Sequence, residues 1–238
     1  MRTAAILPVK RFTRAKRRLG ESVEEELRLD LARAMVADVL LALGRTTSIE
    51  RTIVVTGEGG LASSAREQGA LVVEDASEDG QSAAVALGIH RALAEGIERV
   101  LCIPGDCPAL DPAELEMLLG PPPPYGRGRD RADADRPEVV IVPDRHGSGT
   151  NGLLLNPPNA IAPSFGPDSC ERHRALALAA GAVCRLERPP SLLLDVDTGA
   201  DLTVLRARLS GESGLALRTR AVLGQPGRAS VLSMTSSG

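Results

Sequence analysis

The sequence predicts an α/β protein with a Rossmann-like three-layer sandwich, in which helices cover both faces of a mostly parallel central sheet. Two observations predict this fold class. Short runs rich in Ile, Val and Leu mostly lack polar alternation, which is typical of strands buried on both faces. Helical stretches lie between these runs, and alternating strands and helices build doubly wound sheets. The runs are Ala4–Val9, Thr52–Thr56, Ala70–Val73, Arg99–Ile103, Val139–Val142, Gly152–Leu155 and Leu192–Val196.

Several segments between and after these runs have the apolar spacing of helices. The first, Ser22–Leu43, opens with the pattern Ser-x-x-Glu, which is typical of a capping box at a helix N-terminus. Helices are also predicted over 82–94, 168–180 and 200–209. Gly181 is the expected stop of the 168–180 helix, because glycine is the preferred residue just beyond a helix C-terminus.

These elements fit one domain, which we expect to span residues 1–209. Residues 120–137 interrupt it with consecutive prolines followed by alternating Arg and Asp, a composition that predicts a surface loop without a catalytic role. Residues 210–238 are rich in Gly and Ser with weak periodicity, and they predict a flexible C-terminal tail.

The composition argues against several classes of function. The formal net charge is −3 and the only aromatic residues are Phe12, Phe165 and Tyr125, so a nucleic-acid partner is not expected. No apolar run approaches the ~18 residues of a membrane span, and the N-terminus lacks the pattern of a signal peptide. The four cysteines form no Cys-x-x-Cys pair, which predicts buried reduced thiols in a cytoplasmic protein without a membrane partner.

Asp106 is the first candidate site residue. It follows the predicted strand Arg99–Ile103 within the sequence Ile-Pro-Gly-Asp-Cys-Pro. Ligands of open parallel sheets bind beyond the carboxyl ends of the strands, which is where this carboxylate belongs. An equally open interpretation is an aspartate that only stabilises a turn between prolines.

A pair of acids, Asp195 and Asp197, ends another apolar run. Residues i and i+2 of an extended segment point to the same side, where two carboxylates would repel each other. Mg²⁺ removes that repulsion, because it binds one or two carboxylates together with substrate phosphates. The alternative is that Thr198 and Asp201 form a helix cap, so that the turn exists only to start the next helix.

A basic loop follows the first predicted strand. Within nine residues and with no acid among them stand Lys10, Arg11, Arg14, Lys16, Arg17 and Arg18. A basic loop at the carboxyl end of a central strand can hold a triphosphate, with Lys as a point charge and Arg as a fork. A solvated surface remains the favoured interpretation of Arg11 and Arg17.

A Gly-x-Gly-x-x-Ala pattern gives a rival hypothesis from another class of enzyme. Gly57, Gly59 and Ala62 follow a predicted strand, and Glu74 lies near the offset of a ribose-binding acid. These residues would suit an NAD(P)-dependent oxidoreductase. The pattern follows the second strand rather than the first, and it leaves the basic loop and the aspartates unexplained. A glycine-rich turn with a purely structural role is therefore favoured over a functional one.

Five motifs in order resemble the guanylyltransferases of coenzyme F(420) biosynthesis, known as CofC in archaea and FbiD in bacteria. The resemblance covers residues 3 to 209. The motifs are Pro8-Val9-Lys10 with Ala15-Lys16-Arg17-Arg18-Leu19, Pro104-Gly105-Asp106-Cys107-Pro108, Asp144 to Asn151, Phe165-Gly166-Pro167-Asp168-Ser169 with His173, and Leu194-Asp195-Val196-Asp197-Thr198 with Asp201-Leu202.

This resemblance implies a fold of the nucleotide-diphospho-sugar transferase type and the transfer of GMP from GTP to a phosphorylated three-carbon acid, with release of diphosphate. The expected acceptor is phosphoenolpyruvate, because the Arg-, Ala- and Gly-rich composition suggests a GC-rich bacterium; 2-phospho-L-lactate is the close alternative and 3-phosphoglycerate a further one. The product would pass to a transferase that uses the deazaflavin precursor Fo. A homodimer is one open arrangement, since the sequence does not reveal the oligomeric state.

The resemblance also implies roles for individual residues. Asp106, Asp195 and Asp197 would hold Mg²⁺, as two ions, and Asp106, Lys10 and Lys16 would be catalytic. The GTP-binding residues would be Pro8, Val9, Lys10, Lys16, Gly80 and Ser82, and the acceptor-binding residues Thr150, Gly166 and Ser169.

Three further expectations concern the helix starts. Ser169 would offer an acceptor anion the N-terminus of its helix, while Asp168 could cap that helix, and His173 is interpreted as structural. At Gly80-Gln81-Ser82 the family commonly carries Gly-Leu-Asn. Ser82 can cap a helix but lacks the amide of Asn, which puts the preference for guanine in question.

Overall fold

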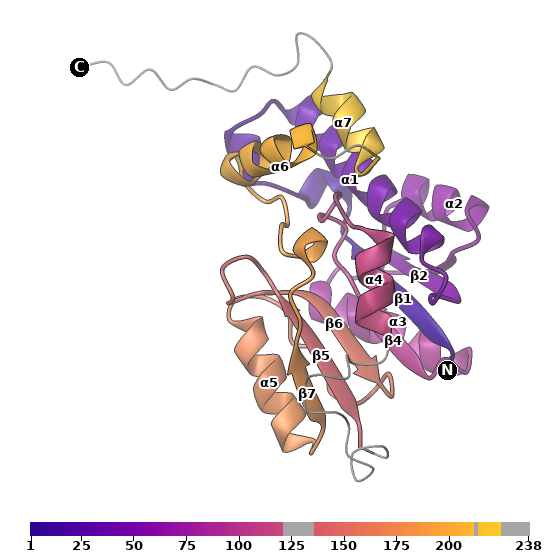
Figure 1. Ribbon diagram of the computed structural model, residues 1–238. Helices are drawn as coiled ribbons and strands as arrows, with labels where there is room; N and C mark the ends of the chain where they lie inside the picture. The colour runs from indigo at the N-terminus through magenta and orange to yellow at the C-terminus, as the bar shows by residue number, and fades with distance from the viewer. Residues whose placement is uncertain (121–135, 212–213, 225–238) are drawn as a thin grey trace.

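The computed structural model describes residues 1–120, 136–211 and 214–224, and it confirms the predicted α/β fold with three layers (Figure 1). The central sheet has seven strands in the order β3-β2-β1-β4-β6-β5-β7. Their bounds are Thr3–Val9 (β1), Arg51–Thr56 (β2), Leu71–Glu74 (β3), Arg99–Cys102 (β4), Glu138–Pro143 (β5), Thr150–Asn156 (β6) and Val183–Leu186 (β7).

The sheet is mostly parallel, as predicted, with one exception. Strand β6 runs antiparallel to both β4 and β5, whereas the other strand pairs are parallel. In β1 the side chains alternate between two clusters, with Leu7 facing one and Ile6 the other. The side chains of residues 4–7 are fully buried on both faces of the sheet, which explains why the sequence of this strand shows no polar alternation.

One predicted strand is wrong and another was missed. Residues 192–196 form no strand: Pro190–Leu192 is a short 3-10 helix, and an irregular segment follows. Leu192 and Val196 are apolar because they are fully buried in loop positions between the sheet and the helices. The missed strand β7 is an edge strand of four residues with partly exposed side chains, too short and too polar to register as an apolar run.

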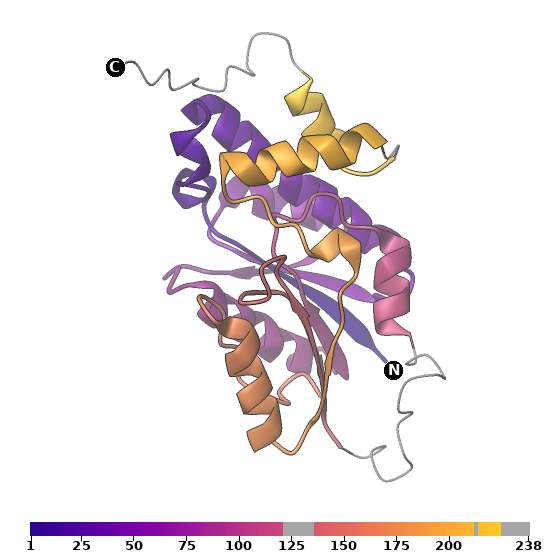
Figure 2. The same ribbon diagram turned by 60° about the vertical axis from the view of Figure 1, so that its left-hand side comes forward.

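Helices cover both faces of the sheet (Figure 2). One face packs against α1 (Glu25–Arg45), α2 (Gly59–Glu67) and α4 (Pro112–Leu119), and the other against α3 (Gln81–Ala94) and α5 (Ser169–Ala179). The helices α6 (Gly199–Gly211) and α7 (Leu217–Leu223) lie outside α1 and share a third apolar cluster with it. No helix of the described ranges is both long and apolar enough to cross a bilayer.

Of the two predictions about helix ends, the glycine stop of α5 is confirmed and the capping box of α1 is wrong. Gly181 follows α5 with a left-handed φ of 63°, as expected of a glycine stop. The capping box at Ser22 is wrong, because α1 begins at Glu25 and no side chain caps its N-terminus. The carboxylate of Glu25 pairs instead with Arg28, one turn into the helix.

The cysteines are thiols, as predicted, but they are not all buried. Cys102, Cys107 and Cys170 are buried, whereas Cys184 is exposed on the edge strand β7. Alternate side chains of this edge strand face solvent. The spacing of the cysteines in the sequence does not indicate that Cys184 lies at such a position.

The C-terminal segment is more ordered than a flexible tail over its described part. Asp38 of α1 is 5% exposed and accepts hydrogen bonds from the backbone N–H groups of Arg218 and Thr219, at 3.0 and 2.8 Å, and from the Thr219 hydroxyl at 2.7 Å. One buried carboxylate thus fixes the start of α7, so the expectation of a flexible tail is wrong for residues 214–224. Residues 212–213 and 225–238, and most of the expected surface loop 120–137, lie outside the described residues.

We predict that Asp38→Ala lowers the free energy of unfolding by about 2 kcal/mol, because it leaves buried donors of α7 without their acceptor. Urea denaturation followed by circular dichroism measures this loss. Glu67→Ala, at an exposed acid of α2, is the matched control and should leave the unfolding midpoint nearly unchanged. Equal stability of the two variants would show that α7 is not anchored through Asp38.

Candidate active site

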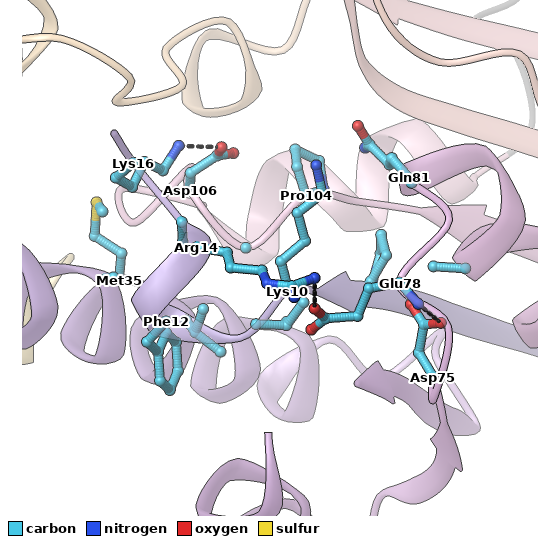
Figure 3. Close-up of a pocket in the computed structure, with 18 of the residues that line it drawn as sticks. Lys10, Phe12, Arg14, Lys16, Met35, Asp75, Glu78, Gln81, Pro104 and Asp106 are labelled. Carbon is cyan, nitrogen blue, oxygen red and sulfur yellow. Dashed lines mark hydrogen bonds and ion pairs between the residues drawn. The ribbon is translucent and has the colours of Figure 1, made fainter. Parts of the chain in front are cut away.

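A cavity of about 290 Å³ lies at the carboxyl ends of β1 and β4, where the sequence predicts the site (Figure 3). After β4 the chain passes against α1 at Gly105, where a Cβ would lie 2.8 Å from a methyl carbon of Val36. Glycine therefore allows the loop that presents Asp106 to lie this close to the helix. Of the residues predicted for the site, the cavity is lined by Pro8, Val9, Lys10, Lys16, Gly80, Asp106 and Asp197.

Lys16 joins the two acidic segments. Its Nζ donates hydrogen bonds to Asp106 Oδ2 and, at 2.5 Å, to Asp197 Oδ1. Burial alone would lower the pKa of Lys16, but the charges of Asp106 and Asp197 outweigh it and raise the pKa above its usual value. Lys16 is therefore a fixed positive charge between two carboxylates that lie far apart in the sequence.

Asp195 lies beside this pair without lining the cavity. Burial, together with the charge of nearby Asp106, raises the pKa of Asp195. The backbone also connects the two segments, since Val196 N donates to Asp106 O at 3.0 Å. The structure thus brings Asp106, Asp195 and Asp197 together, as the sequence predicts.

The sequence analysis includes Asn151 in a family motif but gives it no role, and in the structure it orients Asp195. The Asn151 side chain is 5% exposed, and its Nδ2 donates to Asp195 Oδ1 at 3.1 Å and to Leu192 O at 2.9 Å. The only signal in the sequence is its amide next to Thr150, at the end of a glycine-rich turn.

The turn after Asp197 forms the helix cap that the sequence left open as an alternative. Asp201 Oδ2 accepts hydrogen bonds from the backbone N–H groups of Asp197, at 3.1 Å, and Thr198, at 2.8 Å. Asp201 N in turn donates to the Thr198 hydroxyl, at 3.3 Å, so these residues do form a cap at the start of α6. The same cap holds the backbone of Asp197 in place, and an ion pair with Arg145, at 2.5 Å, ties Asp201 to the loop before β6.

Two further residues, missed in the sequence, hold the basic loop. Arg28 of α1 is buried and donates from Nη1 to the carbonyl oxygens of Phe12, at 3.0 Å, and Ala15. Glu78 accepts from Arg11 N at 3.0 Å and from Arg14 Nη1 at 2.9 Å. A buried Arg within an apolar helix stripe is the signal that could have indicated the first of these contacts.

Thr150, Gly166 and Ser169 do not line the cavity, and Thr150 belongs to a neighbouring network around His173. His173 is fully buried, and this burial, with the charge of Arg172, lowers its pKa to about 4. Its Nε2 accepts from Ser164 N at 2.9 Å, so its Nδ1 carries the proton and donates to Thr150 Oγ1, 3.1 Å away. His173 is thus a neutral structural residue, in line with the sequence interpretation.

Two predicted helix caps are wrong. Asp168 precedes α5 with a left-handed φ of 55° and makes no side-chain cap. Ser82 lies inside α3, which begins after Gly80, and its hydroxyl accepts from Phe165 N at 2.8 Å. Ser82 therefore connects α3 to the segment before α5 and does not line the cavity.

Over the described residues, no group of three or more His, Cys, Asp or Glu side chains is spaced to surround one metal ion. The Lys16 ammonium lies between Asp106 and Asp197, where it already supplies a positive charge.

A model of CofC-like guanylyl transferases matches residues 3–216 of the chain. The chain belongs to this family. A phosphoenolpyruvate guanylyltransferase of Conexibacter woesei is 48% identical over 225 residues, which cover 94% of this chain and 96% of that protein. A protein of the same name from Rubrobacter xylanophilus is 35% identical over 92% of this chain and 99% of its own length.

The fold comparison agrees with this CofC-like membership. A crystal structure from Desulfovibrio desulfuricans, assigned to the nucleotide-diphospho-sugar transferases, has a TM-score of 0.69 at 19% identity and covers 94% of each chain. The predicted fold type is therefore confirmed.

The family does not favour the rival oxidoreductase, and the turn at Gly57 has another task in this CofC-like chain. Gly57 O accepts from Arg11 Nε at 3.1 Å, and Glu58 accepts from Phe12 N at 3.3 Å. A Cβ at position 57 would lie 2.8 Å from the Asp75 carbonyl oxygen. The glycine turn therefore packs against the basic loop and the Asp75 backbone.

We predict that His173 makes the protein less stable as the pH falls from 6.5 toward 4. Its pKa of about 4 in the fold lies below the ordinary histidine value of 6.5, so in this window the unfolded chain binds a proton that the folded chain excludes. The contribution has a slope of at most about 1.4 kcal/mol per pH unit. Urea denaturation at several pH values should show a weaker pH dependence in His173→Asn, whereas the exposed His90→Asn should retain that of the wild type.

Proposed function

We propose that this protein transfers GMP from GTP to phosphoenolpyruvate, with release of diphosphate, as a step of coenzyme F(420) biosynthesis. The relatives from Conexibacter woesei and Rubrobacter xylanophilus, both named phosphoenolpyruvate guanylyltransferases, support this acceptor over 2-phospho-L-lactate and 3-phosphoglycerate. The observation that carries the proposal is the convergence of Asp106 and Asp197 on Lys16 at the cavity wall, with Asp195 close to both acids.

Asp106 offers an oxygen ligand to the Mg²⁺ ions that such a reaction needs. Asp106 Oδ1 is buried, and no group of the described residues pairs with it. A buried carboxylate oxygen without a partner is unfavourable, and a divalent cation with hard oxygen ligands would satisfy it. Asp106, Asp195 and Asp197 would hold the ions. When bound, Mg²⁺ would neutralise charge on the phosphates and act as a Lewis acid.

The protein's own groups have simpler tasks in this mechanism. Lys10 and Lys16 would bind the GTP phosphates as point charges, while Pro8, Val9 and Gly80 form the wall along the nucleotide. An oxygen of the acceptor phosphate attacks the α-phosphorus in line, and the bond to the departing diphosphate breaks. The acceptor is itself the nucleophile, so catalysis consists of positioning and charge neutralisation without a covalent protein intermediate.

The acceptor would lie toward Thr150, Gly166 and Ser169. Gly166 has a left-handed φ of 113°, and Ser169 begins α5, whose N-terminal end favours an anion. The hydrogen bond between Cys170 N and Ser148 O, at 3.0 Å, brings this helix against the loop that leads to Thr150. The same loop reaches the acidic cluster through Asn151. We further propose that the product passes to an Fo-dependent transferase in the cytoplasm; the homodimer stays a prediction.

We predict that Asp106→Asn and Asp197→Asn each reduce turnover about 10²-fold or more while the protein stays folded, because each removes a charge at the reacting phosphates. Diphosphate release from GTP with Mg²⁺ and phosphoenolpyruvate measures turnover. Glu74→Gln, which removes the acid on which the oxidoreductase hypothesis depends, is the control and should keep full activity. Full activity of Asp106→Asn would remove this residue from the site.

A separate prediction concerns Asn151. Asn151→Ala should raise the Mg²⁺ concentration for half-maximal activity about tenfold to a hundredfold, since Asp195 loses the amide that orients it. Titration of diphosphate release with Mg²⁺ measures this, and thermal unfolding checks that the fold persists. An unchanged Mg²⁺ requirement would mean that Asn151 stabilises only the loop at Leu192.

A further inference from the structure

The end of the cavity away from the acidic cluster has its own polar groups. Figure 3 shows Lys16 and Asp106 at one side and Asp75, Glu78 and Gln81 at the other. If the triphosphate lies at Lys16, as the proposed function requires, the nucleoside extends toward this second side. We call Asp75 and Gln81 the distal pair.

Most polar side chains around the distal end are already paired. Glu78 uses one carboxylate oxygen for Arg11 N and the other for Arg14. Its charge is therefore matched by neighbouring cations. The Ser82 hydroxyl accepts from Phe165 N. Neither side chain is available to read a base without giving up a contact that holds the loop.

Asp75 differs from these neighbours. It follows β3, is 4% exposed and lines the cavity, and its backbone N is bonded to Thr56 O at 3.2 Å. Its Oδ1 accepts from Glu78 N at 3.0 Å. Within residues 1–120, 136–211 and 214–224 its Oδ2 has neither a hydrogen-bond donor nor a cation as partner, so the carboxylate presents an acceptor to the cavity.

Gln81 is the other residue of the distal pair. It is the first residue of α3, it lines the cavity, and its amide makes no hydrogen bond with the described part of the chain. In Figure 3 the Gln81 amide points away from Asp75, so only the carboxylate is placed to contact a base between them. A carboxylate acceptor matches the N1–H and N2–H₂ donors on the pairing edge of guanine. Adenine presents an acceptor at N1, which would face the carboxylate and be repelled.

We propose that Asp75 reads guanine by accepting hydrogen bonds from N1–H and the 2-amino group. This inference rests on the proposed function for the direction of the nucleotide.

Asp75→Asn tests the proposal with little risk to the fold, because Asn keeps the Oδ1 acceptor for Glu78 N and replaces only Oδ2 with a donor. Asp79→Asn makes the same change at an exposed acid four positions on and outside the cavity wall. Binding of GTP, ITP, ATP and 2′-deoxy-GTP is measured by calorimetry with Mg²⁺ and without acceptor. Diphosphate release with phosphoenolpyruvate is measured in parallel.

We expect the wild type and Asp79→Asn to bind GTP about tenfold to a hundredfold more tightly than ITP, which lacks the 2-amino group. Asp75→Asn should no longer bind GTP more tightly than ITP, and its preference should shift toward ATP. An unchanged ratio of GTP to ITP in Asp75→Asn overturns the proposal. The proposal is also overturned if Asp75→Asn loses only the discrimination against 2′-deoxy-GTP, because that result would place Asp75 at the ribose. Guanine-selective binding that depends on Asp75, without transfer of GMP to any acid, would support the role of Asp75 and contradict the proposed function instead.

Discussion

The ion pairs of Lys16 with Asp106 and Asp197 are the constraint on which the rest of the site depends. Carboxylates from two distant loops would repel each other at this distance unless a cation lay between them. In this structure the ammonium supplies that cation, and burial strengthens each attraction by excluding water. The surrounding hydrogen bonds fix the two loops where this charge balance is possible: Arg28 holds the loop of Lys16, and Asp201 holds the turn of Asp197.

The topology explains how three separate segments reach one point. β1 and β4 are neighbours in the sheet and parallel, so the loops after their carboxyl ends, with Lys16 and Asp106, lie side by side. The third segment comes from the end of the chain and is held by packing rather than by the sheet. Val196 and the apolar face of α6 bury themselves in the cluster that also contains Leu31 and Met35 of α1. The long first helix thus supports the acidic turn from outside the sheet.

Much of this arrangement is predictable from sequence because it depends on periodicity and on chain order. Buried parallel strands give uninterrupted apolar runs, and the position of Asp106 after such a run predicts its place at the sheet edge. Leu192–Val196 shows the limit, since burial makes a loop as apolar as a strand. The site contacts of Asn151, Glu78 and Arg28 were out of reach for a different reason. Each contact joins the side chain to a backbone group 13 to 67 residues away, and no local pattern encodes such a distance.

The antiparallel strand β6 has a consequence beyond the fold. Its reversed direction brings its first residues, Thr150 and Asn151, to the carboxyl ends of the parallel strands. Thr150 then faces the His173 network and Asn151 faces Asp195, so adjacent residues, whose side chains point to opposite faces of the strand, serve the two halves of the site. A parallel strand in this position would begin at the opposite edge of the sheet. The one exception to parallel order is therefore what couples the His173 network to the acidic cluster.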